Sequence, residues 1–346
     1  MPDTQRVAVY YNNRDVRIEE RPVPKIGPGE LLMRVEACGI CGSDVLEWYR
    51  IKKAPLVLGH ELAGVVEAVG EGVTRYREGD RISVAHHVPC NSCHYCLNGH
   101  PTMCETLLHH TNIDPGGFVE YCRVPAINVD RGVFRLPDQL SFEDATLAEP
   151  LGCVLRGQRI AGLKTGQSVL VLGSGIAGLL HVMAARAQGA AFIAATDVQD
   201  YRLEAARRFG ADLTIHARED VPVRLQERLG HLADLVIVST GAQAVVAQAL
   251  ASVERGGTVL FFASTDPAVS TSLSINDFFW RRDTTLTTTY AAAPEDYQLA
   301  LDLIAAGRVP VSQMITHRVD MANAARGFQI AAAGHDCIKV VVLPHG

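Results

Sequence analysis

A glycine-rich turn between a strand pattern and a helix pattern restricts the fold of this chain more than any other feature. The apolar run at 169–172 leads into the turn, and the segment after it carries apolar residues at the helical period. In such a turn the first glycine permits a sharp bend, the second lets the backbone approach a pyrophosphate, and the third lets helix and strand pack closely. The helix N-terminus adds free N–H groups that bind phosphate. The motif, which predicts a dinucleotide site, consists of Gly173, Ser174, Gly175, Ile176, Ala177 and Gly178.

An acidic residue stands at the end of the next strand pattern, at 192–197. A carboxylate there accepts hydrogen bonds from the ribose hydroxyls of a dinucleotide and repels a 2′-phosphate, so Asp197 favours NAD over NADP. Arg202 follows closely and is assigned to the same cofactor site, where its positive charge would suit a 2′-phosphate. The sequence therefore predicts NAD as the cofactor and leaves an NADP-dependent aldehyde or ketone reductase as the alternative.

The chain changes character near residue 151. Before it, short alternating apolar runs are separated by turn signals such as Pro28-Gly29 and Gly79-Asp80, which is typical of β-structure. From about residue 151 to residue 290, strand patterns alternate with helix patterns, which predicts a parallel α/β sheet. After residue 290, two helical patterns precede a final strand pattern. The strand patterns after residue 151 are 169–172, 192–197, 235–238, 259–262 and 338–343.

Four cysteines lie within one short, loop-like segment. Four thiolates fill a tetrahedral zinc site completely and leave no position for a substrate, so the segment predicts a zinc site that supports structure. A nucleic-acid-binding zinc finger is the other interpretation, but such fingers come with basic helices, and the flanks here are not basic. The candidate ligands are Cys90, Cys93, Cys96 and Cys104. The cysteines outside ligand spacing, which we expect to be buried thiols, are Cys38, Cys122, Cys153 and Cys337.

The composition narrows the functional classes. The 346 residues have a formal net charge of −6, which disfavours nucleic acid and anionic membranes as partners. No apolar run reaches the roughly 18 residues that a membrane helix requires. No basic segment followed by an apolar one marks a secretory signal, so we expect a cytoplasmic protein without a membrane or nucleic-acid partner.

Three residues of zinc-binding type lie far apart in the chain. Cys41, His60 and Glu149 are candidates for a catalytic zinc, which needs about three protein ligands and one open position. Their spacing alone does not show that they meet. Cys153 is a rival for the third ligand, because it follows Glu149 by one helical turn.

The segment around His60 resembles a known zinc signature. In this signature the chain is similar to the medium-chain dehydrogenase/reductase superfamily. The run that starts at Cys41, the cysteine segment and the glycine motif also resemble that superfamily, and the segments occur in the same order along the chain. It looks closest to the polyol and threonine dehydrogenase branch, because Glu149 stands where the alcohol dehydrogenase branch has a cysteine. The signature reads Gly59-His60-Glu61-x2-Gly64-x5-Gly70-x2-Val73.

The resemblance implies an α/β fold of two domains. Residues 1–150 and 291–346 would form a catalytic domain with a GroES-like, partly closed β-barrel. Residues 151–290 would form a Rossmann domain with a doubly wound parallel sheet that binds NAD. The run at 284–290 would be an edge strand that pairs across a dimer axis, so we expect a homodimer or homotetramer.

The resemblance also implies which residues hold two zinc ions in each chain. Cys41 and His60 would bind a catalytic zinc, with Glu149 as the third ligand, directly or through a water. Glu61 would lie behind that metal and exchange with the water. The structural zinc would be held by Cys90, Cys93, Cys96 and Cys104.

The implied activity is hydride transfer between a secondary alcohol and NAD, with zinc polarising the substrate oxygen. The substrate would be a small hydroxylated molecule such as a polyol or sugar alcohol, whose hydroxyl Ser43 would bind, while Asp44 would orient His60. The chain departs from many relatives at Leu46, where a histidine would pass the proton to solvent and leucine cannot. A water chain or Glu47 would then carry the proton. The alternative from another class is a catalytically silent NAD-binding sensor or structural protein. Relatives without zinc lack the signature at His60 and the cysteine segment, whereas this chain has both.

Overall fold

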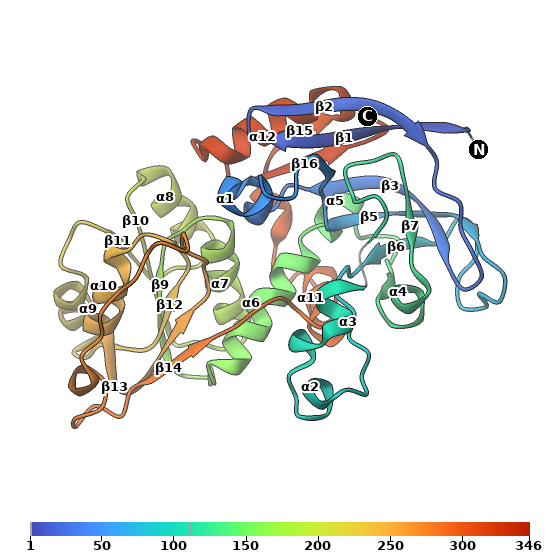
Figure 1. Ribbon diagram of the computed structural model, residues 1–346. Coiled ribbons are helices and arrows are strands. Elements are labelled where there is room, and N and C mark those ends of the chain that lie inside the picture. The colour runs from blue at the N-terminus through green and yellow to red at the C-terminus, as the bar shows by residue number, and fades with distance from the viewer. Residues whose placement is uncertain (1, 111–112) are drawn as a thin grey trace. The chain divides into compact units, whose positions relative to one another are not determined.

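Two units make up the chain (Figure 1). The computed structural model describes residues 2–110 and 113–346. The first unit comprises Met1–Gly152 and Ala291–Gly346, and the second comprises Cys153–Tyr290. Among the described residues, no helix combines the length and the apolar character that crossing a membrane requires.

The second unit is built on a parallel sheet with the strand order β11-β10-β9-β12-β13-β14. Counted along the chain, this order is 3-2-1-4-5-6, which is the doubly wound order of a Rossmann sheet and confirms the predicted fold class. All residues of the central strand β9 are buried, which explains the uninterrupted apolar run in its sequence. The strands are β9 (Ser168–Leu172), β10 (Phe192–Asp197), β11 (Leu213–His216), β12 (Ala233–Val238), β13 (Val253–Phe261) and β14 (Thr285–Thr288).

Helices connect these strands and flank the sheet. Helix α7 contacts β9 and β10, helix α10 contacts β12 and β13, and Figure 1 shows the two on opposite sides of the sheet. Helix α7 begins within the glycine motif and buries residues 178–185 without a break. The helices are α7 (Ile176–Ala187), α8 (Asp200–Arg208), α9 (Val221–Leu229) and α10 (Ala244–Ser252), with a 3-10 turn η3 (Ile275–Asp277).

The predicted strands of this unit are present, with two differences. The sequence pattern does not predict β11, because only Ile215 of its four residues is fully buried and the strand lacks an apolar run. Strand β13 begins at Val253, earlier than the predicted 259, because Gly256 and Gly257 interrupt its apolar pattern. The pairing of β12 with β13 shifts register at the same place.

Two β-sheets form the first unit. A three-stranded sheet has the order β2-β1-β4, and a seven-stranded sheet has the order β15-β16-β3-β5-β6-β8, with β7 paired to β3. They share one apolar core, in which the ring of Phe328 lies 5.8 Å from that of Tyr10 and 5.2 Å from that of Phe118. The strands are β1 (Thr4–Asn12), β2 (Asp15–Pro22), β3 (Leu31–Gly39), β4 (Leu56–Val57), β5 (Glu61–Val69), β6 (Arg81–Val84), β7 (Tyr121–Val124), β8 (Val133–Arg135), β15 (Ile315–Asp320) and β16 (Lys339–Leu343).

The helices of the first unit are short until residue 148. The longest of those described before it is α4, with 6 residues, whereas α6 starts at Ala148 and continues into the second unit. The helices are α1 (Glu47–Arg50), α2 (His94–Leu97), α3 (Glu105–His109), α4 (Ala126–Arg131), α5 (Phe142–Ala145), α6 (Ala148–Ile160), α11 (Pro294–Ala305) and α12 (Ala324–Ala333). The 3-10 turns are η1 (Gly42–Val45), η2 (Pro101–Met103), η4 (Val311–Met314) and η5 (Met321–Asn323).

Strand β3 positions the residues of zinc-binding type. Its last residue, Gly39, pairs with Glu61, the first residue of β5, while Val341 of β16 pairs with Gly39 from the other side. His60 precedes β5 and Cys41 follows β3, so the antiparallel register brings two residues that are distant in sequence to the same end of the sheet.

Candidate active site and metal centres

Cys41 caps the short turn η1 that follows β3. Its Sγ accepts hydrogen bonds from the main-chain N and the hydroxyl of Ser43, both at 3.4 Å. The main-chain N of Cys41 donates to Oδ2 of Asp44 at 3.0 Å, which closes the cap from the other side. The thiol is therefore held in one orientation while part of the side chain remains accessible.

Cys41, His60 and Glu61 form a set with the geometry of a metal site. One ligand atom from each of these residues lies within 4.8 Å of the other two. Sulfur, imidazole nitrogen and carboxylate oxygen are the ligands that zinc binds, and three of them leave an open position. The donor set therefore fits a catalytic zinc.

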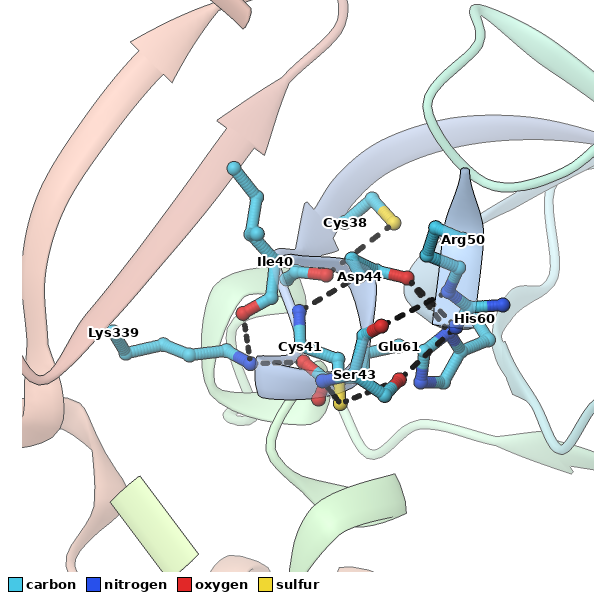
Figure 2. Close-up of polar contacts among 10 residues, drawn as sticks. Cys38, Ile40, Cys41, Ser43, Asp44, Arg50, His60, Glu61 and Lys339 are labelled. Carbon is cyan, nitrogen blue, oxygen red and sulfur yellow. Dashed lines mark hydrogen bonds and ion pairs between the residues drawn. The ribbon is translucent and has the colours of Figure 1, made fainter. Parts of the chain in front are cut away.

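A buried carboxylate lies behind His60. Asp44 is fully buried, and its Oδ1 lies 3.5 Å from Nδ1 of His60 and 3.3 Å from a guanidinium nitrogen of Arg50 (Figure 2). Burial raises the pKa of Asp44, and the charges of His60 and Arg50 oppose that shift. The position suits the predicted orienting role, because an imidazole that binds a metal donates its other N–H to a carboxylate, a main-chain carbonyl or a water.

The charged groups around His60 favour a positive charge on its imidazole. Burial alone would lower the pKa of His60, but the charges of Asp44, Cys41 and Glu149 outweigh it and raise the pKa well above its usual value. Such a concentration of negative groups is also what a buried metal cation requires. The electrostatics therefore agree with the donor set.

Glu149 lies in a second set with His86 and His87. The ligand atoms of these three residues also lie within 4.8 Å of one another, and the rings of His60 and His86 are 4.8 Å apart. Burial lowers the pKa of His87 to about 3 and that of His86 well below its usual value. Burial therefore favours the neutral form of both imidazoles, which is the form that binds a metal or shares hydrogen bonds with a hydroxyl group.

The four cysteines at 90–104 converge as the sequence predicts. Their sulfur atoms lie within 4.8 Å of one another. Main-chain N–H groups point at them: Ser92 and Cys93 donate to Sγ of Cys90 at 3.5 and 3.3 Å, and Cys90 donates to Sγ of Cys104 at 3.3 Å. The hydrogen bonds from Ser92 and Cys93 lower the pKa of Cys90 to about 5. This donor set fits a closed tetrahedral zinc site.

The glycine motif of the second unit forms a tight turn at the N-terminus of α7. Gly173 has φ 94°, which favours glycine, and a Cβ on Gly178 would lie 1.9 Å from the carbonyl oxygen of Gly173. Gly175, Ile176 and Ala177 are partly exposed at the start of α7, where no side chain caps the helix in this described segment. The N–H groups of this helix end are therefore available to an anion.

Asp197 is held beside the motif. Its Oδ2 accepts the main-chain N–H of Ser174 at 2.9 Å, and its Oδ1 accepts that of Gln199 at 3.0 Å. A guanidinium nitrogen of Arg202 lies 3.8 Å from the same carboxylate. Asp197 and Arg202, which the sequence predicts to belong to the cofactor site, therefore lie next to the glycine turn.

Comparison with known proteins identifies the family. Residues 27–138 match the alcohol dehydrogenase GroES-like domain, and residues 177–306 match the zinc-binding dehydrogenase family. A sorbitol dehydrogenase of Gallus gallus is 32% identical over 345 residues, which cover 96% of this chain and 95% of the relative. The chain belongs to the zinc-dependent alcohol dehydrogenase family. An L-threonine 3-dehydrogenase of Bacillus licheniformis is 34% identical over 332 residues, covering 93% of this chain and 94% of the relative.

Solved structures of the alcohol dehydrogenase family agree with this assignment. A zinc-binding dehydrogenase from Sinorhizobium meliloti 1021, solved with bound NADP, has a TM-score of 0.89 and 28% identity, and the match covers 99% of this chain and 100% of that one. The predicted resemblance to the polyol and threonine branch is confirmed, and the protein is a zinc-dependent dehydrogenase.

Two expectations about single side chains need correction or refinement. Cys153 is partly exposed and not buried as expected, because its position on α6 leaves it less covered than its fully buried neighbours Leu151 and Val154. Glu47, a suggested substitute for the missing relay histidine, is exposed and accepts a hydrogen bond from the main chain of Asn13 at 3.3 Å.

Sequence reasoning misses four residues that adjoin the site of this dehydrogenase. Two features of the sequence could reveal three of them. A pair of histidines stands directly before the cysteine segment, and a lone lysine stands inside an apolar strand pattern, where its charge needs a buried partner. The missed residues are Arg50, His86, His87 and Lys339.

Proposed function

We propose that this protein oxidises a secondary hydroxyl group of a small polyhydroxylated substrate with NAD, using one catalytic zinc. The observation that carries the proposal is the partly buried cluster in which Cys41 and His60 meet Glu61, with Glu149 in the neighbouring set. The names of its relatives, a sorbitol and a threonine dehydrogenase, support this substrate class. Residues 1–150 with 291–346 would be the catalytic domain, and residues 151–290 the NAD domain.

The chain's own residues would hold the reacting groups in place. Zinc bound by Cys41, His60 and Glu149 would supply a Lewis acid for the substrate oxygen, and NAD would accept the hydride. Ser43 would bind the substrate hydroxyl. Its Oγ accepts a hydrogen bond from Arg50 at 3.0 Å and donates one to Cys41, so the hydroxyl group is held beside a proposed zinc ligand. Leu46 offers no group for the proton, so the proton has to leave through other polar groups or water.

A second zinc would be structural. Its ligands would be Cys90, Cys93, Cys96 and Cys104, whose converging sulfurs and N–H donors support the assignment. Because a closed site offers no position to a substrate, this zinc would stabilise the segment and take no part in turnover. The proposed stoichiometry is therefore two zinc ions in each chain.

NAD is the proposed cofactor because Asp197 lies beside the glycine turn, and a carboxylate there would bind the ribose hydroxyls and repel a 2′-phosphate. Arg202, 3.8 Å from that carboxylate, and the relative solved with NADP favour the alternative of an NADP-dependent reductase. In a spectrophotometric screen of polyols, amino-polyols, sugars and β-hydroxy amino acids, we expect reduction of NAD at least about tenfold more efficient than that of NADP. An Asp197→Ala variant should lose much of this preference. Turnover with NADP alone would favour the reductase, and zinc-loaded protein without turnover would favour the silent binding protein.

We further propose a homodimer or homotetramer of cytoplasmic chains. The support is β14, which lies at the edge of the parallel sheet within the predicted run 284–290. The neighbouring segment exposes large apolar side chains: Ile275, Phe279 and Trp280 are 68%, 62% and 63% exposed. Exposed apolar clusters of this kind favour association. Light scattering should give a mass of two or four chains, and a single monomeric peak would contradict the proposal.

A further inference from the structure

An arginine side chain reaches back from the end of helix α1 to the turn η1. Arg50 is the last residue of α1, and its side chain is 13% exposed. Its Nε donates a hydrogen bond to the carbonyl oxygen of Ser43 at 2.9 Å, and its Nη2 donates one to Oγ of Ser43 at 3.0 Å (Figure 2). The same Nη2 lies 3.3 Å from Oδ1 of the buried Asp44. One guanidinium group therefore contacts two successive residues of the turn.

The guanidinium group of Arg50 is held in one orientation. Two donors on one edge contact two oxygens of Ser43, and such a two-point contact defines the plane of an arginine side chain. The group also lies over the ring of Tyr49, with Cζ 4.6 Å from the ring centroid. The main-chain N of Arg50 donates to the carbonyl oxygen of Leu46 at 3.0 Å, which fixes the base of the side chain. The contact with Ser43 is therefore fixed from several sides.

This contact limits the rotation of the Ser43 hydroxyl group. A hydroxyl group has one hydrogen to donate and two acceptor positions. In Ser43 the hydrogen is directed to Sγ of Cys41 at 3.4 Å, and one acceptor position is filled by Arg50. The acceptor position that remains is the one that a substrate hydroxyl can use. Arg50 therefore holds the group that would bind the substrate.

Arg50 is not a substitute for the missing proton relay. It follows Leu46 by one helical turn, and Leu46 stands where many relatives have a histidine. A guanidinium group has donors only and stays protonated in proteins, so it cannot take a proton from Ser43. The contact can orient the hydroxyl group, but it cannot pass the proton on.

On the basis of the function proposed above, we propose that Arg50 is a positioning residue that holds the Ser43 hydroxyl against the substrate oxygen. Arg50 acts through Ser43 and makes no contact with the reacting atoms. Without the guanidinium group the hydroxyl rotates, and a small misplacement of a group at the reacting centre lowers rates by up to about 100-fold. The contribution of Arg50 therefore disappears when the Ser43 hydroxyl is removed.

The first test is a double-variant cycle measured as kcat/KM with the best alcohol of the screen. Arg50→Met keeps much of the length of the side chain and should lower kcat/KM by about 10- to 100-fold. In a Ser43→Ala background the same change should cost less than about threefold, because the group that Arg50 positions is absent. A merely structural role predicts the same loss in both backgrounds.

Three further variants separate positioning from charge and from folding. Arg14→Met removes an exposed arginine and should leave kcat/KM unchanged. Methylguanidinium added to Arg50→Ala should restore part of the lost rate, and it should restore none when Ser43 is also replaced with alanine. If Arg50→Met does not fold, Arg50→Lys keeps the charge without the two-point contact, and its loss should again depend on Ser43.

A second measurement needs neither substrate nor metal. In protein with 15N-labelled arginine, NMR should show hindered rotation of the Arg50 guanidinium group, whose signals are identified by their loss in Arg50→Met. Ser43→Ala should speed this rotation, because it removes the acceptor of Nη2.

An equal loss from Arg50→Met in both backgrounds would overturn the role of Arg50. Free rotation of the guanidinium group in the unaltered protein would also overturn it, because the contact with Ser43 would then be absent. Failure of the proposed function gives a different result. The unaltered protein would then oxidise no alcohol of the screen although the rotation is hindered, and the contact would be structural only.

Discussion

Replacing Cys41 with serine is expected to reduce turnover by about 10³-fold or more, because a serine hydroxyl is not ionised near neutral pH and binds zinc weakly. The rest of the fold should persist, since Cys41 lies in a partly exposed turn and not in the apolar core. The measurement is kcat/KM for NAD reduction with the best substrate of the screen, at saturating zinc.

Cys153→Ser is the matched control for this variant. Cys153 is a partly exposed cysteine on α6, and it is the rival candidate for the third ligand. If Glu149 supplies that ligand, the control should retain turnover close to that of the unaltered protein. Turnover in Cys41→Ser that matches the control would contradict the assignment of the catalytic zinc.

Replacing Cys104 with serine is expected to act on stability. The side chain of Cys104 is 1% exposed, and its sulfur accepts the main-chain N–H of Cys90 at 3.3 Å. Loss of a bound metal is among the few single changes that cost more than about 4 kcal/mol of unfolding free energy. Thermal denaturation should therefore show a strong decrease in Tm, while the molecules that remain folded keep their kcat.

Asn98→Ala provides the comparison for Cys104→Ser within the same segment. Asn98 is exposed and donates hydrogen bonds to His94, without contributing a ligand. We expect its zinc content to be unchanged and its Tm to decrease only slightly. A Cys104→Ser protein with the Tm and the zinc content of Asn98→Ala would contradict the assignment of Cys104 as a ligand of the structural zinc.

The parts of this protein that the sequence predicts well are those in which the determining residues are close together. The glycine motif carries its strand, turn and helix within one continuous segment, and β10 coincides with the predicted 192–197. The four cysteines likewise converge because short turns and the helix α2 lie between them. Local spacing fixes the geometry in both cases, so no knowledge of the rest of the fold is needed.

The active-site cluster could not be assembled from spacing. Cys41 and His60 meet because β3 pairs with β5 in a register that places Gly39 opposite Glu61, and a sequence does not show such long-range pairing. Only the resemblance to a family brought these residues together in advance. The pairing of Lys339 with Glu61 cannot be predicted for the same reason, because it depends on the β16–β3–β5 arrangement.

The most direct test of the central claim is the zinc content of purified Cys41→Ser protein, determined by elemental analysis beside its turnover. The account predicts that the unaltered protein holds two zinc ions in each chain, whereas the variant is folded, retains the zinc of the cysteine segment and lacks both the second zinc and the activity. A variant that keeps both zinc ions, or one that turns over normally with only the cysteine-bound zinc, would contradict it.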